Sequence, residues 1–227
     1  MDARTAPCQR ARRPMGQPAS PAQETCAFKV RPDCGQLFIL YTGMAGQMML
    51  PPMHFIQQAQ ILDRNLMILR DLNHCCYQRG ISLRHPTIPS FLRWQRETLK
   101  LKFPKVNEVY CIGSSGGAYA ALLSGHFLKV KKVWAFAPPV PVQPTDRIAY
   151  VDPEFSDLGR VLAADNGTTQ YEIFFNESEQ TDRLAAERLR ELPGVTLSPQ
   201  AGEGHGVVVH LAQTGQLGRL LPEFTSC

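Results

Sequence analysis

Short apolar stretches recur along the chain and are separated by longer segments of mixed polarity. Those with the length and composition of β-strands lie at 27–30, 36–41, 65–70, 109–112, 132–137, 170–175 and 195–198. The run at 36–41 is apolar at almost every position, which is typical of a strand buried on both faces of a parallel sheet. The pattern therefore predicts a sheet of buried strands.

Helical segments are expected between these strands. We place them at 55–62, 90–102, from the glycine-rich corner after 112 to about 127, and at 157–164, 183–192 and 207–220. Asp182 is expected to cap the helix at 183–192, because an Asp side chain accepts hydrogen bonds from the first free N–H groups of a helix. The alternation of strand and helix predicts an α/β fold, a mostly parallel sheet with helices on both faces.

The domain organisation is simple. Residues 1–25 are rich in Pro, Ala, Gln and Arg and lack hydrophobic periodicity, so we expect a disordered leader there. Residues 26–227 are expected to form a single domain, since 227 residues with 44% hydrophobic content can build one sizeable core.

Composition excludes several classes of function. The net charge of +4 is mild and no dense basic stripe alternates with aromatic residues, so nucleic-acid binding is not expected. No apolar run reaches the length of a membrane span. The seven cysteines are scattered, which favours reduced thiols and a cytoplasmic location. No spacing of His, Cys or Asp indicates a metal site, and no cofactor is expected. The sequence does not indicate an oligomeric state.

The chemistry is concentrated at residues 113–117, Gly-Ser-Ser-Gly-Gly, which match the pattern G-x-S-x-G with Ser115 at its centre. A sharp strand-to-helix corner holds its central residue in a strained conformation and projects the side chain from the edge of the sheet. Glycine is needed on either side because strand and helix pass close together there. The free N–H groups at the start of the following helix can stabilise a developing negative charge.

From about residue 36 onward the chain resembles the α/β-hydrolases. The features that carry the resemblance are the corner Gly43-Met44 after an early strand, the elbow at 113–117, acidic residues after the strand at 170–175, and a late loop histidine, His205. They occur in the order found in that family. The resemblance implies an α/β-hydrolase fold with little or no lid and the activity of a serine hydrolase.

The resemblance also implies a role for each site residue. Ser115 would be the nucleophile, His205 the general base, and the backbone N–H groups of Met44 and Gly116 the oxyanion hole. The acid should lie between 175 and 205, where Asp182 is favoured and Glu179 is the second choice. Glu177 also qualifies by position.

The substrate is less defined by the sequence. The segment 138–169 is too short for the large helical lid of many lipases, so we expect a small-molecule or carrier-bound acyl substrate. Candidate pocket walls are Val140 and Val142 on one side and, unless they pack on the helix behind, Met44, Met48, Met49 and Leu50 on the other. Asp71, at a strand end, is expected to cap a turn.

Two classes of function remain at this point. The first is a serine hydrolase acting on a carboxylic ester or thioester, including a thioesterase or acyltransferase of secondary metabolism. The second is a catalytically inactive protein of the same fold that serves as a binding or accessory module, because fold and function are separable.

Overall fold

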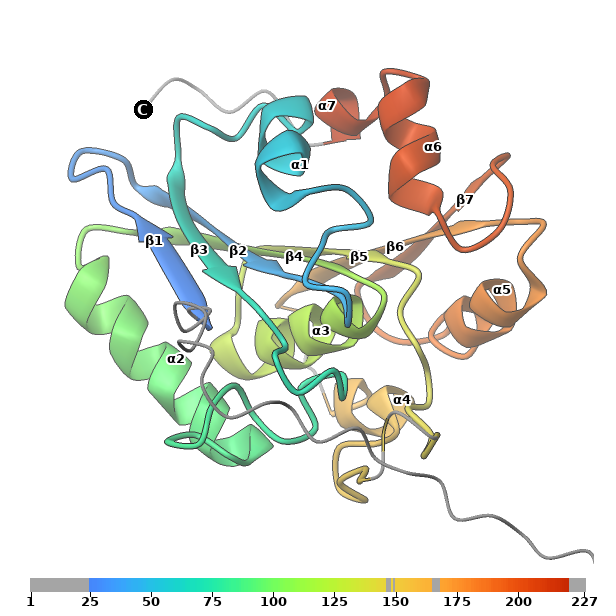
Figure 1. Ribbon diagram of the computed structural model, residues 1–227, viewed down its shortest axis with the longest axis horizontal. Coiled ribbons are helices and arrows are strands. Elements are labelled where there is room, and N and C mark those ends of the chain that lie inside the picture. The colour runs from blue at the N-terminus through green and yellow to red at the C-terminus, as the bar shows by residue number, and fades with distance from the viewer. Residues whose placement is uncertain (1–24, 146–147, 149, 165–167, 221–227) are drawn as a thin grey trace, which may run out of the picture.

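A single sheet organises the computed structural model, which describes residues 25–145, 148, 150–164 and 168–220 (Figure 1). The sheet has seven strands in the order β1-β3-β2-β4-β5-β6-β7. The strands are β1 (Cys26–Lys29), β2 (Gln36–Tyr41), β3 (Asn65–Leu69), β4 (Glu108–Ser114), β5 (Lys132–Phe136), β6 (Gln170–Asn176) and β7 (Val195–Gln200). The expected leader lies, apart from its last residue, outside the described residues.

The sheet is parallel except at one edge, where β1 pairs antiparallel with β3. Every predicted strand is present with its ends within two residues of the expected positions, and β2 has the predicted bounds. The central strand β4 lies between β2 and β5, so the elbow that follows it opens at the middle of the sheet. The prediction of a mostly parallel α/β sheet is confirmed.

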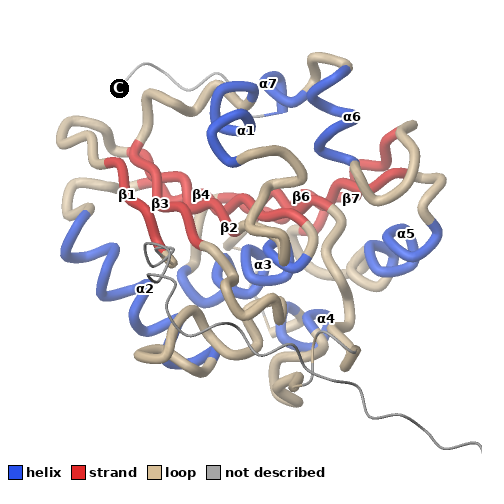
Figure 2. Tube along the Cα trace, viewed as in Figure 1, coloured by secondary structure: helices blue, strands red, loops and turns tan. Residues whose placement is uncertain are grey.

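Helices cover both faces of this sheet (Figures 1 and 2). They are α1 (Pro52–Gln58), α2 (Ile88–Lys102), α3 (Gly116–Leu128), α4 (Leu158–Leu162), α5 (Gln180–Glu187), α6 (Val207–Gln213) and α7 (Leu217–Leu220). Buried residues of α1, α6 and α7 form one core cluster with the sheet, and those of α2 to α5 form the other. The two clusters contain the apolar residues that the strand pattern placed inside.

Helices α1 and α5 each begin three residues before the predicted position, at Pro52 and Gln180, and end earlier than predicted, at Gln58 and Glu187. Two further helices differ from their predicted bounds for local reasons. The expected helix at 207–220 is divided into α6 and α7, because Gly215 adopts a positive φ of 67° between them. Helix α2 begins at Ile88 rather than 90, since Pro89 lies in its first turn, where no N–H is needed. Thr87 caps this helix by accepting a hydrogen bond from the Ser90 N–H at 3.3 Å.

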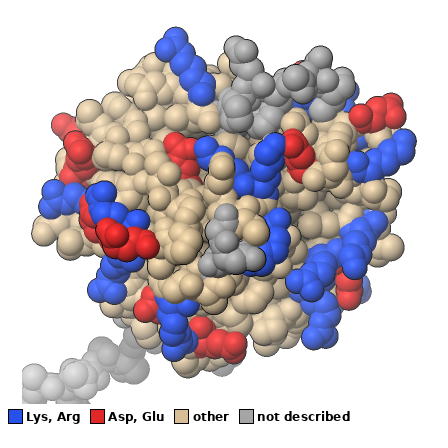
Figure 3. Space-filling view, turned by 180° about the vertical axis from the view of Figure 1, so that it is seen from behind, with Lys and Arg blue, Asp and Glu red and all other residues tan. Residues whose placement is uncertain are grey.

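Charge and cysteine chemistry were also predicted. Figure 3 shows Lys and Arg interspersed with Asp and Glu over one face of the molecule. No helix in the described ranges is long and apolar enough to cross a membrane. Four described cysteines are not disulfide-bonded, namely Cys26, Cys75, Cys76 and Cys111. Cys34 is disulfide-bonded, so the expectation of reduced thiols is wrong for that residue.

Candidate active site

Ser115 occupies the corner between β4 and α3 and has a strained backbone, with φ 52° and ψ −127°. Its N–H donates to the Phe136 carbonyl at 2.8 Å, which ties the corner to β5. The flanking glycines permit the turn: a Cβ atom on Gly117 would lie 2.1 Å from the Tyr41 carbonyl oxygen. A Cβ on Gly113 would lie 2.2 Å from the Gly117 carbonyl oxygen. The corner therefore has the close strand-to-helix approach that the motif predicts.

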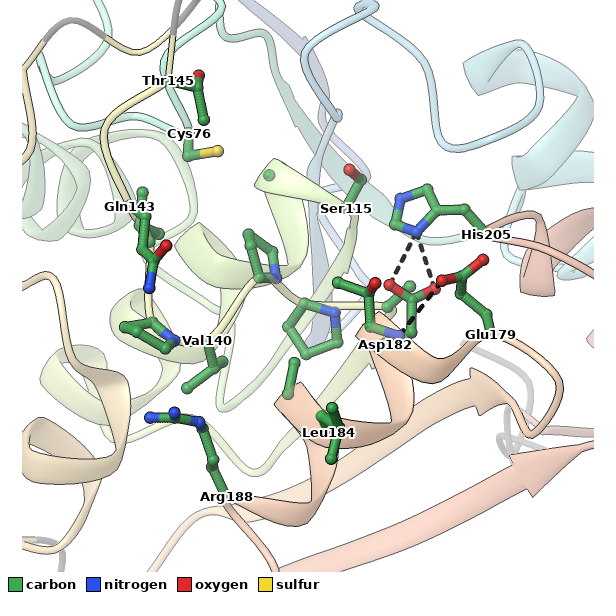
Figure 4. A pocket seen from close by; sticks show the side chains of 18 of the residues that line it. Cys76, Ser115, Val140, Gln143, Thr145, Glu179, Asp182, Leu184, Arg188 and His205 are labelled. Atoms are coloured by element: carbon green, nitrogen blue, oxygen red, sulfur yellow. Dashed lines mark hydrogen bonds and ion pairs between the residues drawn. The ribbon is translucent and has the colours of Figure 1, made fainter.

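His205 lies in the loop between β7 and α6, and its ring reaches Asp182. Its Nδ1 is 2.8 Å and 3.0 Å from the two carboxylate oxygens of Asp182. In Figure 4 the ring lies between Asp182 and Ser115, and its other nitrogen faces the Ser115 side. The Asp182 side chain is 9% exposed and that of His205 50% exposed, so a buried carboxylate supports a half-exposed imidazole.

The acidic residues near His205 occupy different places. Glu179 is the N-cap of α5, and its carboxylate accepts a hydrogen bond from the Thr181 N–H at 3.3 Å. The expectation that Asp182 caps this helix is wrong, because α5 begins at Gln180 and places Asp182 in its first turn. Glu179 lines the same cavity as His205, whereas Glu177 does not. The geometry brings Asp182, and not Glu179, to the imidazole.

Two polar side chains that sequence reasoning missed hold the His205 loop. Asn176, at the end of β6, donates to the carbonyl oxygens of Glu203 and Gly204 at 3.1 Å and 2.8 Å. Ser178 donates to the Gly202 carbonyl oxygen at 2.9 Å. Asn176 is the last residue of β6 and Ser178 follows it, and this place at the carboxyl end of a parallel strand was the available signal, since functional residues collect there in open α/β sheets.

Met44 and Gly116 line the same cavity as Ser115. They are neighbours, because a Cβ atom on Gly116 would lie 3.4 Å from Met44 Cγ. Neither N–H donates a hydrogen bond within the described part of the chain. His74 Nδ1 donates to the Met44 carbonyl oxygen and so holds the following peptide, between Met44 and Ala45.

Asp71 shapes the wall next to this corner. Its Oδ2 accepts hydrogen bonds from the N–H groups of Cys75 and Tyr77 at 2.8 Å and 3.1 Å. Burial raises the pKa of this carboxyl group, and the backbone hydrogen bonds oppose that shift. Asp71 therefore caps a turn, as expected, and this turn places Cys76 against Gly116 in the cavity wall.

The cavity has a volume of about 790 Å³. Val140, Val142 and Met44 line it as predicted. Met48, Met49 and Leu50 do not; they pack in the core cluster on the other face of the sheet, with α1. Sequence reasoning missed six lining residues that bear polar or reactive groups, namely Cys76, Gln143, Thr145, Gln180, Thr181 and Arg188.

No protein-family model matches the sequence, and no curated protein matches it. Solved structures do. Est1E from Butyrivibrio proteoclasticus, solved with ferulic acid bound, aligns with a TM-score of 0.61 and 12% identity over 87% of this chain and 94% of its own. A lipase-esterase related protein from Clostridium acetobutylicum gives 0.60 and 11% over 88% and 98%. The Pyrococcus furiosus esterase Pf2001 gives 0.54 and 14% over 83% and 80%. The chain has the α/β-hydrolase fold.

The α/β-hydrolase neighbours named above are esterases or esterase-related proteins. Identities of 11–14% establish a shared fold and do not transfer a substrate, since one fold carries many chemistries. Evidence for the reaction therefore comes from Ser115, His205 and the residues around them.

Proposed function

We propose that the chain is a serine hydrolase that cleaves a carboxylic ester or thioester through an acyl-enzyme on Ser115. The observation that supports this most directly is the place of His205, whose Nδ1 is hydrogen-bonded to Asp182 while its other ring nitrogen faces Ser115 on a strained corner (Figure 4). A serine hydroxyl needs such an adjacent base to become nucleophilic.

In this proposal each group has one task. Ser115 Oγ attacks the carbonyl carbon and His205 Nε2 takes its proton, while Asp182 holds the ring and stabilises the imidazolium. The N–H groups of Met44 and Gly116 donate to the oxyanion. The imidazolium then protonates the leaving group, and water, activated by the same ring, attacks the acyl-enzyme and releases the acid.

A fluorophosphonate probe should label the wild-type protein on Ser115, because it captures an activated serine covalently. Labelling should disappear in Ser115→Ala and become slow in His205→Ala. Intact-mass measurement and peptide mapping would locate the adduct. If the folded wild-type protein does not react, the proposed hydrolase is wrong and the chain is an inactive member of this fold.

Ser114→Ala provides a matched control for labelling. Ser114 is the neighbouring serine of the same motif, is fully buried, and donates a hydrogen bond to the Gln47 carbonyl at 3.3 Å. Its hydroxyl is out of reach of the probe, so labelling of Ser114→Ala should persist. Loss of labelling in this variant with unchanged circular dichroism would argue against Ser115 as the reacting group.

The pH dependence should report on His205. The hydrogen bond to Asp182 raises the pKa of His205 above its usual 6.5, against the effect of burial. A general base must be neutral, so kcat/KM should rise with pH through a value above 6.5. The pKa of His205 should fall in Asp182→Asn. NMR titration of the imidazole, with Ser115→Ala compared with Ser115→Ala/Asp182→Asn, would measure this change. An unchanged His205 pKa in Asp182→Asn would contradict the pairing of His205 with Asp182.

A further inference from the structure

One guanidinium group lines the cavity without a partner among the described residues. Arg188, the C-cap residue of α5, is an exposed lining residue. Within the described ranges it forms no ion pair and donates no hydrogen bond, whereas Arg190, two residues away, is paired with Glu187 at 2.5 Å. Arg188 is also the only Lys or Arg among the described residues that line this cavity.

The position of Arg188 follows from the helix. Thr181, Leu184, Ala185 and Arg188 line the cavity, at the spacing of three and four residues that places side chains on one helix face. Arg188 is six positions after Asp182, which corresponds to about 9 Å along the axis of α5. In Figure 4 Arg188 lies well away from His205, beyond Leu184. The basic group is thus at the far end of the cavity.

The surface between the two ends is apolar. Pro139, Val140 and Pro141 line the cavity, as does Leu184 on α5. Leu184 is 55% exposed, so a ligand in the cavity would bury its side chain, and this burial of apolar surface would stabilise the complex. The site therefore combines an apolar channel with a cation at its end.

The orientation of a bound ester decides which part reaches Arg188. The leaving group must lie beside His205, because that ring protonates it. The acyl chain then extends away from His205, toward Arg188. The acidic pair Asp182 and Glu179 lies at the His205 end, so a negative group is repelled there and attracted at the other end.

We infer that this enzyme acts on esters or thioesters whose acyl chain ends in a carboxylate, and that Arg188 binds this carboxylate. The inference rests on the proposed hydrolase function. A guanidinium binds a carboxylate with two parallel hydrogen bonds, which gives selectivity as well as affinity. Chains of a length that spans the channel are bound best.

Kinetics with matched esters test this inference. The p-nitrophenyl half-esters of glutaric, adipic, suberic and sebacic acids are compared with p-nitrophenyl esters of fatty acids of the same lengths. Wild type should prefer the acid-ended ester at the optimal length by about tenfold, the scale of one charge-assisted contact. Arg188→Gln should lose the preference and keep its activity on the neutral ester, and Arg188→Glu should disfavour the acid-ended ester.

Arg190→Gln removes the same charge from the same end of α5 without touching the cavity, so it should retain the preference. The preference should also weaken with added NaCl, because Arg188 is exposed. The inference is overturned if wild type shows no preference, or if Arg188→Gln keeps it.

A binding measurement separates this inference from the proposed chemistry. A keto acid in which a methyl ketone replaces the ester is compared with the ketone of equal length that ends in a methyl group, by ligand-observed NMR on Ser115→Ala. Tighter binding of the keto acid that is lost in Ser115→Ala/Arg188→Gln supports the carboxylate site even if no ester is turned over. Equal binding of both ligands, with neutral esters hydrolysed normally, refutes the site and leaves the hydrolase intact.

Discussion

Replacing Asp182 by Asn is expected to lower kcat for ester hydrolysis by about 10⁴-fold. The carboxylate is 2.8 Å from His205 Nδ1 and holds the ring so that Nε2 can take the Ser115 proton. An amide of the same shape keeps the packing but cannot stabilise the imidazolium, and its NH₂ group favours the wrong tautomer. Steady-state kinetics on a p-nitrophenyl ester, with active sites counted by fluorophosphonate titration, would measure the effect.

Glu179→Gln is the matched control for Asp182→Asn. Glu179 lines the same cavity and belongs to the same helix end, but its carboxylate accepts from the Thr181 N–H. The change should therefore leave kcat within a few-fold of wild type and cost some helix stability through the weaker cap. The opposite result, full activity in Asp182→Asn and loss in Glu179→Gln, would transfer the acid role to Glu179.

These two acids show where sequence reasoning stops. Both follow β6, and both lie within the range that the family order allows. Which of them meets His205 depends on where α5 begins: Glu179 precedes the helix as its N-cap, whereas Asp182 projects from the first turn. The predicted helix start at 183 made Asp182 the cap, whereas the observed start at Gln180 makes Glu179 the cap.

The strands were easier to predict than their surroundings. A run such as 36–41 is apolar because it is buried on both faces, so its pattern identifies it without any knowledge of its neighbours. The apolar residues Met48 to Leu50 carry no such information. They lie in a loop, and nothing in the sequence says on which face of the sheet a loop packs; here they join the core with α1 and leave Met44 at the cavity.

Arg188 illustrates the same limit for the substrate. An arginine at a helix C-terminus has an ordinary explanation, the favourable interaction of a cation with the last carbonyl groups. Its place in the cavity is visible only when α5 packs beside the segment at 138–142, which brings together residues about 45 positions apart in the sequence. Long-range packing of this kind is not encoded in local periodicity.

The elbow at 113–117 was predictable from its local sequence, because the glycines of the motif are required by the same close approach of strand and helix that the structure shows. Gly117→Ala is expected to destabilise the fold by more than about 4 kcal/mol, since a Cβ atom there would lie 2.1 Å and 2.6 Å from the carbonyl oxygens of Tyr41 and Thr42. They are backbone atoms of the last residue of β2 and of the residue after it, so relief requires α3 to move away from the sheet. Urea unfolding followed by circular dichroism would measure the loss.

Gly206→Ala is the control, because its φ is −84° and a Cβ would meet nothing closer than 3.9 Å, an ordinary contact. It should unfold at nearly the wild-type urea concentration. A Gly117→Ala protein that is as stable as Gly206→Ala would show that α3 does not approach β2 as closely as described. The strained backbone of Ser115 would then lose its support, because the tight packing of Gly117 is what holds the corner in that conformation.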